Sequence, residues 1–92
     1  MRIVWDRRAV RELEDIWPYI AQDNIQAAEE MAQLIQSRVL GLQEFPELGR
    51  RGRICKTREL VVTPYIVIYQ IYEDRIGVRA VLYGRRRWPK RL

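Results

Sequence analysis

The 92-residue sequence contains no histidine and only one cysteine, Cys55. These absences exclude a zinc site built from histidine and cysteine ligands, and a serine or cysteine nucleophile activated by histidine. No glycine-rich phosphate loop is present, and no apolar run approaches the roughly 20 residues of a membrane-spanning helix. A lone cysteine forms no disulfide within its chain, which is typical of the reducing cytosol, so we expect a cytoplasmic location. We expect no metal or cofactor, and any catalysis must rest on arginine, lysine, tyrosine or carboxylate side chains.

Lysine is also scarce, and the positive charge is unevenly distributed. Of 17 basic residues only Lys56 and Lys90 are lysines, and the formal net charge is +5. Residues 1–49 carry a net charge of −4, whereas residues 50–92 carry +9. Arginine binds carboxylates and phosphates through a planar fork of donors. The second half of the chain therefore favours an anionic partner, either nucleic acid or an acidic protein.

The hydrophobic pattern predicts a single α+β domain over residues 1–92, with the order β-α-α-β-β-β. Apolar residues recur every three or four positions in two segments that follow Asp6 and Asn24, and we expect both residues to cap helices. The predicted strands are residues 2–5, 53–56, 58–62, 65–72 and 75–83, with 53–56 and 58–62 forming either two short strands or one bent strand. We expect an antiparallel sheet packed against an N-terminal two-helix hairpin.

Two details of this pattern make specific predictions. Pro18 lies inside the first helical segment and has no backbone N–H, so we expect a kink or an early end there. In the last strand, positions 76, 78, 80 and 82 are all apolar, and alternation places them on one face. The opposite face, which we expect to be partly open, would then carry Arg79 and Tyr83.

The segment Gly84–Leu92 is a basic tail with the sequence GRRRWPKRL. Its cations can neutralise anionic groups, and its indole ring can stack on a base or a guanidinium. A solvated tail with the tryptophan folded back onto the domain is an equally good interpretation. The candidate target-contact residues are Arg85, Arg86, Arg87, Trp88, Lys90 and Arg91.

Five stretches of the chain form a further pattern. They are Ile3–Trp5, Asp15–Ile20, Phe45–Arg53, Thr57–Val62, and Pro64–Tyr69 followed by Val81–Pro89. Together they span nearly the whole chain, in an order that resembles the RelE/ParE family of bacterial type II toxins. The resemblance implies a growth-inhibiting toxin with a role in plasmid stabilisation.

The family contains two mechanisms. RelE-like members cleave mRNA in the ribosomal A site, where basic side chains and a tyrosine or histidine promote attack by the 2′-hydroxyl, whereas ParE-like members poison DNA gyrase. The nuclease pattern is depleted here. Its strand lysines fall on Thr57 and Glu59, the arginine after its central-strand tyrosine on Ile66, and its late tyrosine on Leu92. One arginine of that pattern is kept, at Arg86.

This depletion favours the ParE-like mechanism, in which the protein binds its target and is not an enzyme. An mRNA endoribonuclease is the alternative, and Tyr83 stands where many relatives have a histidine. The substitute catalytic set would be Arg58, Arg79, Tyr83 and Arg86. A non-toxic nucleic-acid-binding module is a third interpretation.

Both toxin interpretations imply a cognate antitoxin, ParD-like or RelB-like, that forms a hetero-oligomer with the toxin. By family resemblance, its C-terminal segment fills an apolar groove beside the helices and masks basic residues. The candidate groove residues are Trp5, Leu13, Trp17 and Ile20. The target is DNA gyrase or the ribosome with its mRNA, and no membrane contact is expected.

Overall fold

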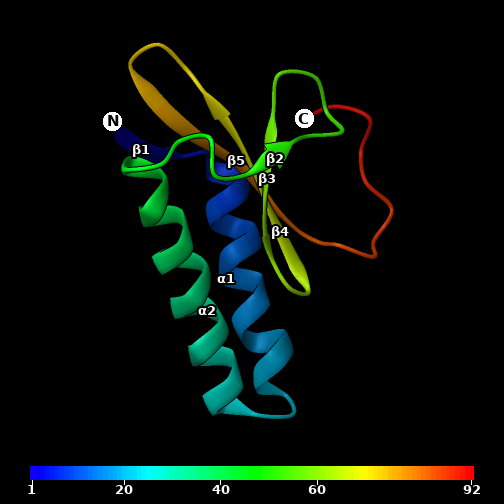
Figure 1. Cartoon of the computed structure of the whole chain (residues 1–92). Coiled ribbons are helices and arrows are strands. Elements are labelled where there is room, and N and C mark those ends of the chain that lie inside the picture. Colours follow the sequence, from blue (N-terminus) through cyan, green and yellow to red (C-terminus); the bar gives the residue numbers. More distant parts are fainter.

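In the computed structural model, which describes residues 1–92, two helices cover one face of a five-stranded sheet (Figure 1). The elements are β1 (Arg2–Trp5), α1 (Arg7–Ala21), α2 (Ile25–Leu40), the 3-10 helix η1 (Gly41–Gln43), β2 (Arg50–Arg51), β3 (Arg58–Val62), β4 (Tyr65–Ile71) and β5 (Arg75–Tyr83). The predicted α+β class and the helical hairpin are confirmed. No helix of the chain combines the length and the apolar composition that a membrane span requires.

The sheet is mixed, so the expectation of a wholly antiparallel sheet is wrong at one edge. Its strand order is β1-β5-β4-β3-β2, and β1 runs parallel to β5, with Ile3 beside Ile76 and Trp5 beside Val78. All other neighbouring strands are antiparallel. Parallel neighbours need a long crossover connection, which the helices and the intervening strands supply. The hydrophobic pattern records which residues are buried but not the direction of pairing.

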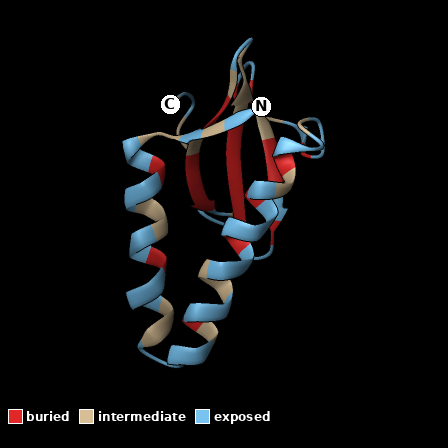
Figure 2. Cartoon of the chain, turned by 90° about the vertical axis from the view of Figure 1, so that its left-hand side faces the viewer, coloured by how far each residue is buried: buried red, intermediate tan, exposed pale blue.

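The main core lies between the helices and the sheet. It contains thirteen buried residues, among them Ile35 and Val39 of α2, Tyr69 of β4 and Val78 of β5. In Figure 2 the buried helical positions face inward, and both helices continue beyond the sheet with mostly exposed surfaces. Each fully buried aliphatic side chain stabilises the fold by roughly 1.5–3 kcal/mol. The sheet-facing parts of the helices therefore hold the fold, while their far ends stay available for other contacts.

Helix α1 is not ended by its proline. It continues to Ala21, so of the two alternatives expected at Pro18, a kink or an early end, the early end is wrong. Pro18 is exposed, and it removes only one hydrogen bond close to the end of the helix. Ile16 and Ile20, on either side of it, pack on the main core. Tertiary packing therefore outweighs the local cost of the proline.

The two predicted caps behave differently. Asn24 caps α2 as expected, since its Oδ1 accepts a hydrogen bond from the Ala27 N–H at 3.0 Å. Asp6 occupies the N-cap position of α1, but its side chain makes no capping hydrogen bond. Its Oδ2 instead accepts from Arg79 Nε at 2.7 Å. A long-range ion pair has displaced the local cap.

A β-bulge at Arg79 divides β5 into two registers. Val78 and Ala80 pair with adjacent β4 residues, Tyr69 and Ile68, so Arg79 has no partner in β4. Val78 belongs to the main core, whereas Ala80 belongs to a small cluster apart from it. The expectation that positions 76, 78, 80 and 82 share one face is wrong, because one extra residue turns the rest of the strand over. Positions 81 and 83 face the helices instead.

Polar side chains hold this bulge in place. The Val81 N–H donates to Glu12 Oε1 of α1 at 3.1 Å. Besides its bond to Asp6, Arg79 donates through Nη1 to Gln70 Oε1 at 3.0 Å. The start of α1 is therefore tied directly to the point where β5 changes register.

The loop before β2 is built around Tyr69. The hydroxyl of this buried tyrosine accepts from the Gly49 N–H at 2.8 Å and donates to the Pro46 carbonyl at 2.7 Å. A Cβ at Gly49 would lie 2.7 Å from the Tyr69 ring, so a side chain there would displace the ring. The glycine of this loop is thus required by close packing.

Residues 53–56 form a turn, so the predicted strand there is wrong. The paired residues lie earlier, in β2, where Arg50 is beside Glu59 of β3. Lys56 has a left-handed φ of 65°, which a continuous strand does not allow. The turn directs Ile54 into the same small cluster as Ala80.

Candidate functional site

The basic tail, residues 84–92, folds back over the sheet and returns to the β2–β3 turn (Figure 1). Trp88 and Leu92 pack against the small cluster, whose buried members are Ile54, Ile68, Ala80 and Leu82. Trp88 Nε1 donates to the Tyr83 carbonyl at 3.3 Å. The Arg53 guanidinium lies over the Trp88 ring, with Cζ 3.5 Å from the ring centroid. Two apolar side chains and one stacked arginine therefore attach the tail to the domain.

The cations of the tail stay outside this contact. Within the tail, the exposed cations that form no ion pair are Arg85, Arg86, Arg87, Lys90 and Arg91. Elsewhere several arginines are matched by carboxylates, as Arg79 is by Asp6. Five unpaired cations on one short segment create a local positive potential that attracts an anionic partner.

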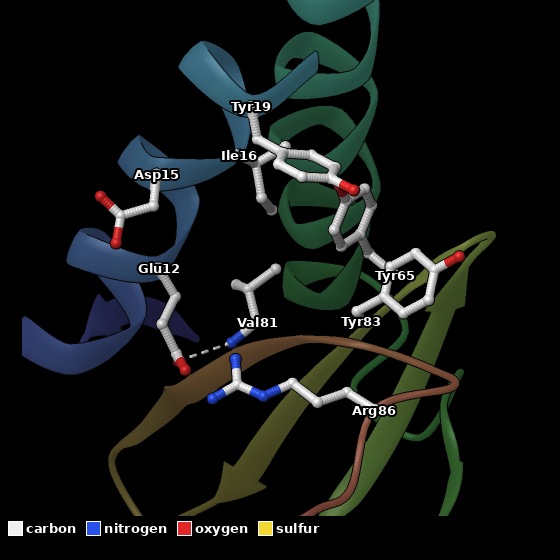
Figure 3. Close-up of a pocket in the computed structure, with 8 residues that line it drawn as sticks. All are labelled: Glu12, Asp15, Ile16, Tyr19, Tyr65, Val81, Tyr83 and Arg86. Atoms are coloured by element: carbon white, nitrogen blue, oxygen red, sulfur yellow. Dashed lines mark hydrogen bonds between the residues drawn. The ribbon is translucent and has the colours of Figure 1, made fainter.

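A tyrosine pocket of about 440 Å³ opens between α1 and the end of β5 (Figure 3). It is lined by Glu12, Asp15, Ile16, Tyr19, Tyr65, Val81, Tyr83 and Arg86. The rings of Tyr65 and Tyr83 meet edge to face, with centroids 5.8 Å apart. Burial raises the pKa of Tyr65, and the nearby phenols of Tyr19 and Tyr83 raise it further. Aromatic rings beside two carboxylates and one cation suit an amphipathic side chain of a partner.

The four predicted groove residues are not in one place. Trp5 and Leu13 line a hollow of about 430 Å³ between β1, α1 and α2. Trp17 lies farther along α1 and is 39% exposed. Ile20 packs on the main core, as Trp5 and Leu13 do, but it does not line that hollow. The hairpin also exposes large apolar side chains that the sequence had not singled out, namely Val10, Tyr19, Ile25, Leu34 and Leu40. Its apolar surface is therefore wider than the predicted groove.

Residues 3–88 match the family described as the ParE toxin of the type II toxin-antitoxin system, parDE. The chain belongs to the ParE toxin family. It is the toxin of a type II toxin–antitoxin module, which confirms the resemblance found in the five stretches.

Two relatives of this ParE-family toxin align over almost its whole length. "Putative toxin Y4kP" of Sinorhizobium fredii is 41% identical over 91 residues, covering 97% of this chain and 94% of that protein. "Toxin RelE2" of Caulobacter vibrioides is 29% identical over 85 residues, covering 92% of this chain and 97% of that protein. Both are toxins by name, and neither name states a target.

Solved structures show the same fold. A chain of the chromosomal ParDE TA system from P. aeruginosa superposes with a TM-score of 0.81 at 22% identity, covering 90% of this chain and 95% of that chain. A chain of the intact E. coli RelBE toxin-antitoxin complex gives a TM-score of 0.64 at 15% identity, covering 92% of this chain and 98% of that chain. The ParE-family and RelE-family folds are therefore shared, and fold alone does not separate the two mechanisms.

The four residues of the alternative catalytic set do not form one cluster in the toxin. Tyr83 and Arg86 line the tyrosine pocket together. Arg58 begins β3, where its Nη1 donates to the Gly49 carbonyl at 2.8 Å. Arg79 lies at the bulge, held by its carboxylate and amide partners. Arg58 of β3 pairs with Tyr69 of β4, whereas Tyr83 of β5 pairs with Tyr65 of β4. Tyr65 and Tyr69 are four residues apart, which is about 13 Å along a strand, so Arg58 and Tyr83 are well separated.

The two positions where nuclease relatives have strand lysines are both buried. Thr57 Oγ1 donates to the Ile54 carbonyl at 2.6 Å. Glu59, only 2% exposed, accepts from the Arg53 N–H at 2.8 Å and pairs with Arg50 Nη2 at 2.9 Å. Burial alone would raise the pKa of Glu59, but the hydrogen bonds and charges of the two arginines outweigh it and hold that pKa below its usual value.

The contact of Arg53 with Glu59 and Trp88 was not predicted from the sequence. The available signal was a single carboxylate, Glu59, at the end of the otherwise basic segment 50–59. A buried carboxylate surrounded by arginines in the sequence must pair with at least one of them. The spacing of the residues does not show which arginine that is.

Proposed function

We propose that this ParE-family toxin arrests growth by binding DNA gyrase through its basic tail, and that it does not cut RNA. The observation that carries the proposal is the set of five exposed tail cations that no carboxylate of the chain neutralises. Phosphates of gyrase-bound DNA and carboxylates of gyrase itself are both suitable partners for arginine. The toxin acts in the cytoplasm, where it would meet this target.

The placement of the other residues supports binding over cleavage. Attack by a 2′-hydroxyl needs a base, an acid and a group that stabilises charge around one phosphate. The chain has no histidine, and of the alternative set only Tyr83 and Arg86 share a surface. Thr57 and Glu59 are buried and hydrogen-bonded within the domain. The exposed groups that this half of the chain offers to a target are therefore mainly cations, which bind an anionic partner.

A supercoiling assay with purified toxin and gyrase tests the proposal. We expect wild-type toxin to inhibit supercoiling. A tail variant with Arg85, Arg86 and Arg87 all changed to Gln should inhibit at least about tenfold less, which corresponds to about 1.4 kcal/mol of lost binding. Undiminished inhibition by this variant would exclude the tail as the contact, and inactive wild-type toxin would exclude gyrase.

The matched control removes the same charge from the helices. Arg7, Arg11 and Arg38 are exposed and form no ion pair, so changing all three to Gln also lowers the net charge by three. We expect this variant to inhibit gyrase as strongly as wild type. Equal loss in both triple variants would mean that total charge, and not the tail, determines inhibition.

One observation favours ribosome-dependent mRNA cleavage as a second candidate: Tyr83 and Arg86 line the same pocket. If this candidate is right, toxin added to programmed ribosomes yields cut mRNA, and Arg86→Ala abolishes the cutting. Intact mRNA with wild-type toxin removes it. Normal growth of cells that express the chain alone would remove both toxin mechanisms and leave a nucleic-acid-binding module.

We further propose that a ParD-like or RelB-like antitoxin covers the apolar surface of the hairpin. Its exposed large side chains include Trp17, Tyr19 and Leu34. An amphipathic helix binds such a surface through side chains spaced three and four residues apart. Co-expression of the antitoxin should restore growth, and Trp17→Asp should weaken this rescue. If the antitoxin restores growth fully in cells that express the Trp17→Asp variant, the antitoxin binds another surface of the toxin.

A further inference from the structure

Glu59 is the one carboxylate buried in the toxin, and its contacts go beyond neutralising a charge. Its Oε1 accepts from Arg50 Nε at 3.0 Å, and its Oε2 accepts from the Arg53 N–H at 2.8 Å. Arg53 Nε lies 3.4 Å from the same Oε2. Glu59 therefore orients both the backbone and the guanidinium of Arg53.

Arg53 connects this buried carboxylate to the tail. Its Cζ lies 3.5 Å from the centroid of the Trp88 ring, so the guanidinium covers the indole. A guanidinium that meets a carboxylate at its edge keeps its planar face free for stacking. The Arg53 side chain is half exposed, so Glu59 and Trp88 together restrict a group that would otherwise sample many rotamers.

Trp88 in turn determines where the tail cations lie. It sits between Arg85–Arg87 on one side and Lys90–Arg91 on the other. Its other contacts are the hydrogen bond to the Tyr83 carbonyl and packing on the small cluster. Both groups of cations extend from this anchored ring.

We infer that Glu59 is a positioning residue for target contact: through Arg53 it holds Trp88, and so sets where the tail presents its cations. This inference rests on the proposed role of the tail. The competing explanation is that Glu59 only stabilises the β2–β3 turn.

Arg50 separates the two explanations. It binds Glu59 as closely as Arg53 does, with Nη2 2.9 Å from Oε1, but only Arg53 lies on the Trp88 ring. Arg50→Gln therefore removes one ion pair of Glu59 and leaves the path to the tail intact. Arg53→Gln removes an ion pair and breaks that path, while Arg50 and the residue 53 N–H still satisfy Glu59.

The experiment uses Trp88 fluorescence in a full-length toxin that carries Trp5→Phe and Trp17→Phe, so that one indole reports. We expect the acrylamide quenching constant to rise about twofold in Arg53→Gln, because the stacked guanidinium no longer shields the ring. Glu59→Gln should raise it similarly, and Arg50→Gln should leave it unchanged. Arg53→Lys, which keeps a cation near both partners, should retain most of the shielding. Circular dichroism verifies the fold, and if Glu59→Gln does not fold, the Arg53 and Arg50 variants suffice.

The same variants, with their native tryptophans, are then compared in the supercoiling assay. We expect Arg53→Gln to inhibit gyrase several-fold less than Arg50→Gln does. Unchanged quenching in Arg53→Gln, or equal changes in the Arg50 and Arg53 variants, would overturn the positioning role. Altered quenching with full gyrase inhibition would overturn its importance for target contact. Altered quenching with an inactive wild-type toxin would support the placement of the tail and refute the gyrase proposal separately.

Discussion

The two coverings of the sheet, helices and tail, are built by different means. The helices enclose a cluster of thirteen buried residues drawn from α1, α2, η1 and three strands. The tail covers a cluster of only four buried residues with Trp88 and Leu92, beside the buried carboxylate of Glu59. The first arrangement buries much apolar area and few charges. The second buries little apolar area and keeps the tail cations exposed. The part of the molecule that stabilises the fold is therefore separate from the part that carries the exposed positive charge.

Cavity-forming substitutions should show the largest difference between the two clusters. Ile35 in the main core and Ile68 in the small cluster are both fully buried. We expect Ile35→Ala to lower the free energy of unfolding by about 3–4 kcal/mol, because two packed layers cannot close the cavity. Ile68→Ala should cost about 2 kcal/mol, because the tail can settle into the space. Urea denaturation measures both, and equal losses would contradict the comparison.

Removing one hydroxyl from the main core should have the next largest effect. Tyr69→Phe leaves the Gly49 N–H and the Pro46 carbonyl without their partner. We expect a loss of about 1–3 kcal/mol in thermal or urea unfolding. Tyr72→Phe, at a partly exposed tyrosine, is the control and should change stability by less than about 0.5 kcal/mol. Similar losses in the two variants would mean that this hydroxyl does not organise the loop.

The two regions should also lose stability at opposite ends of the pH scale. The pKa of Glu59 is lowered in the fold, so the unfolded chain binds more protons in acid and stability falls as pH decreases through and below 4.5. Burial raises the pKa of Tyr65 and Tyr69, so the unfolded chain releases protons first and stability falls as pH increases above 10. Asp74 also has a lowered pKa, through its hydrogen bond with Arg75, but it is exposed and adds little.

Urea midpoints measured from pH 3 to pH 7 test the acid side of this contrast. Glu59→Gln should flatten the decline toward low pH, although it is less stable at pH 7. Glu44→Gln, at an exposed position on the main-core side, should keep the wild-type slope. A wild-type slope in Glu59→Gln would show that other carboxylates govern acid unfolding.

The smallest effect on stability is expected at the tail cations. Arg87 is exposed and unpaired, so Arg87→Gln should change the free energy of unfolding by less than about 0.5 kcal/mol. Gyrase inhibition by the same variant should nevertheless fall several-fold, since a target contact is lost. A large loss of stability would show that the tail cations support the fold.

Local features of the chain were predicted correctly where neighbouring residues decide them. The helical hairpin follows from apolar residues at three- and four-residue spacing, and the cap at Asn24 follows from its amide oxygen. The side-chain cap expected at Asp6, the early helix end expected at Pro18 and the strict alternation expected through Arg79 were wrong, because a partner far away in the chain or the packed core outweighs local preference there. The bulge at Arg79 is the clearest case, since strict alternation gives no sign of an extra residue.

The candidate site divides in the same way. The sequence identified the basic tail, and its aromatic residue, because the charge is concentrated in one run. It did not indicate that Trp88 would lie beneath Arg53, or that Arg53 would be oriented by Glu59. These contacts join segments that approach one another only after the sheet has formed.

By itself, the sequence determined the family, the α+β class and the excess of arginine, because each is encoded in residue types and short spacings. Only the tertiary structure decided the direction of β1, the face on which Tyr83 lies and the partner of the single buried carboxylate. The physical reason is that strand direction, register and ion pairing depend on distances between residues remote in the chain. Hydrophobic periodicity contains no information about those distances.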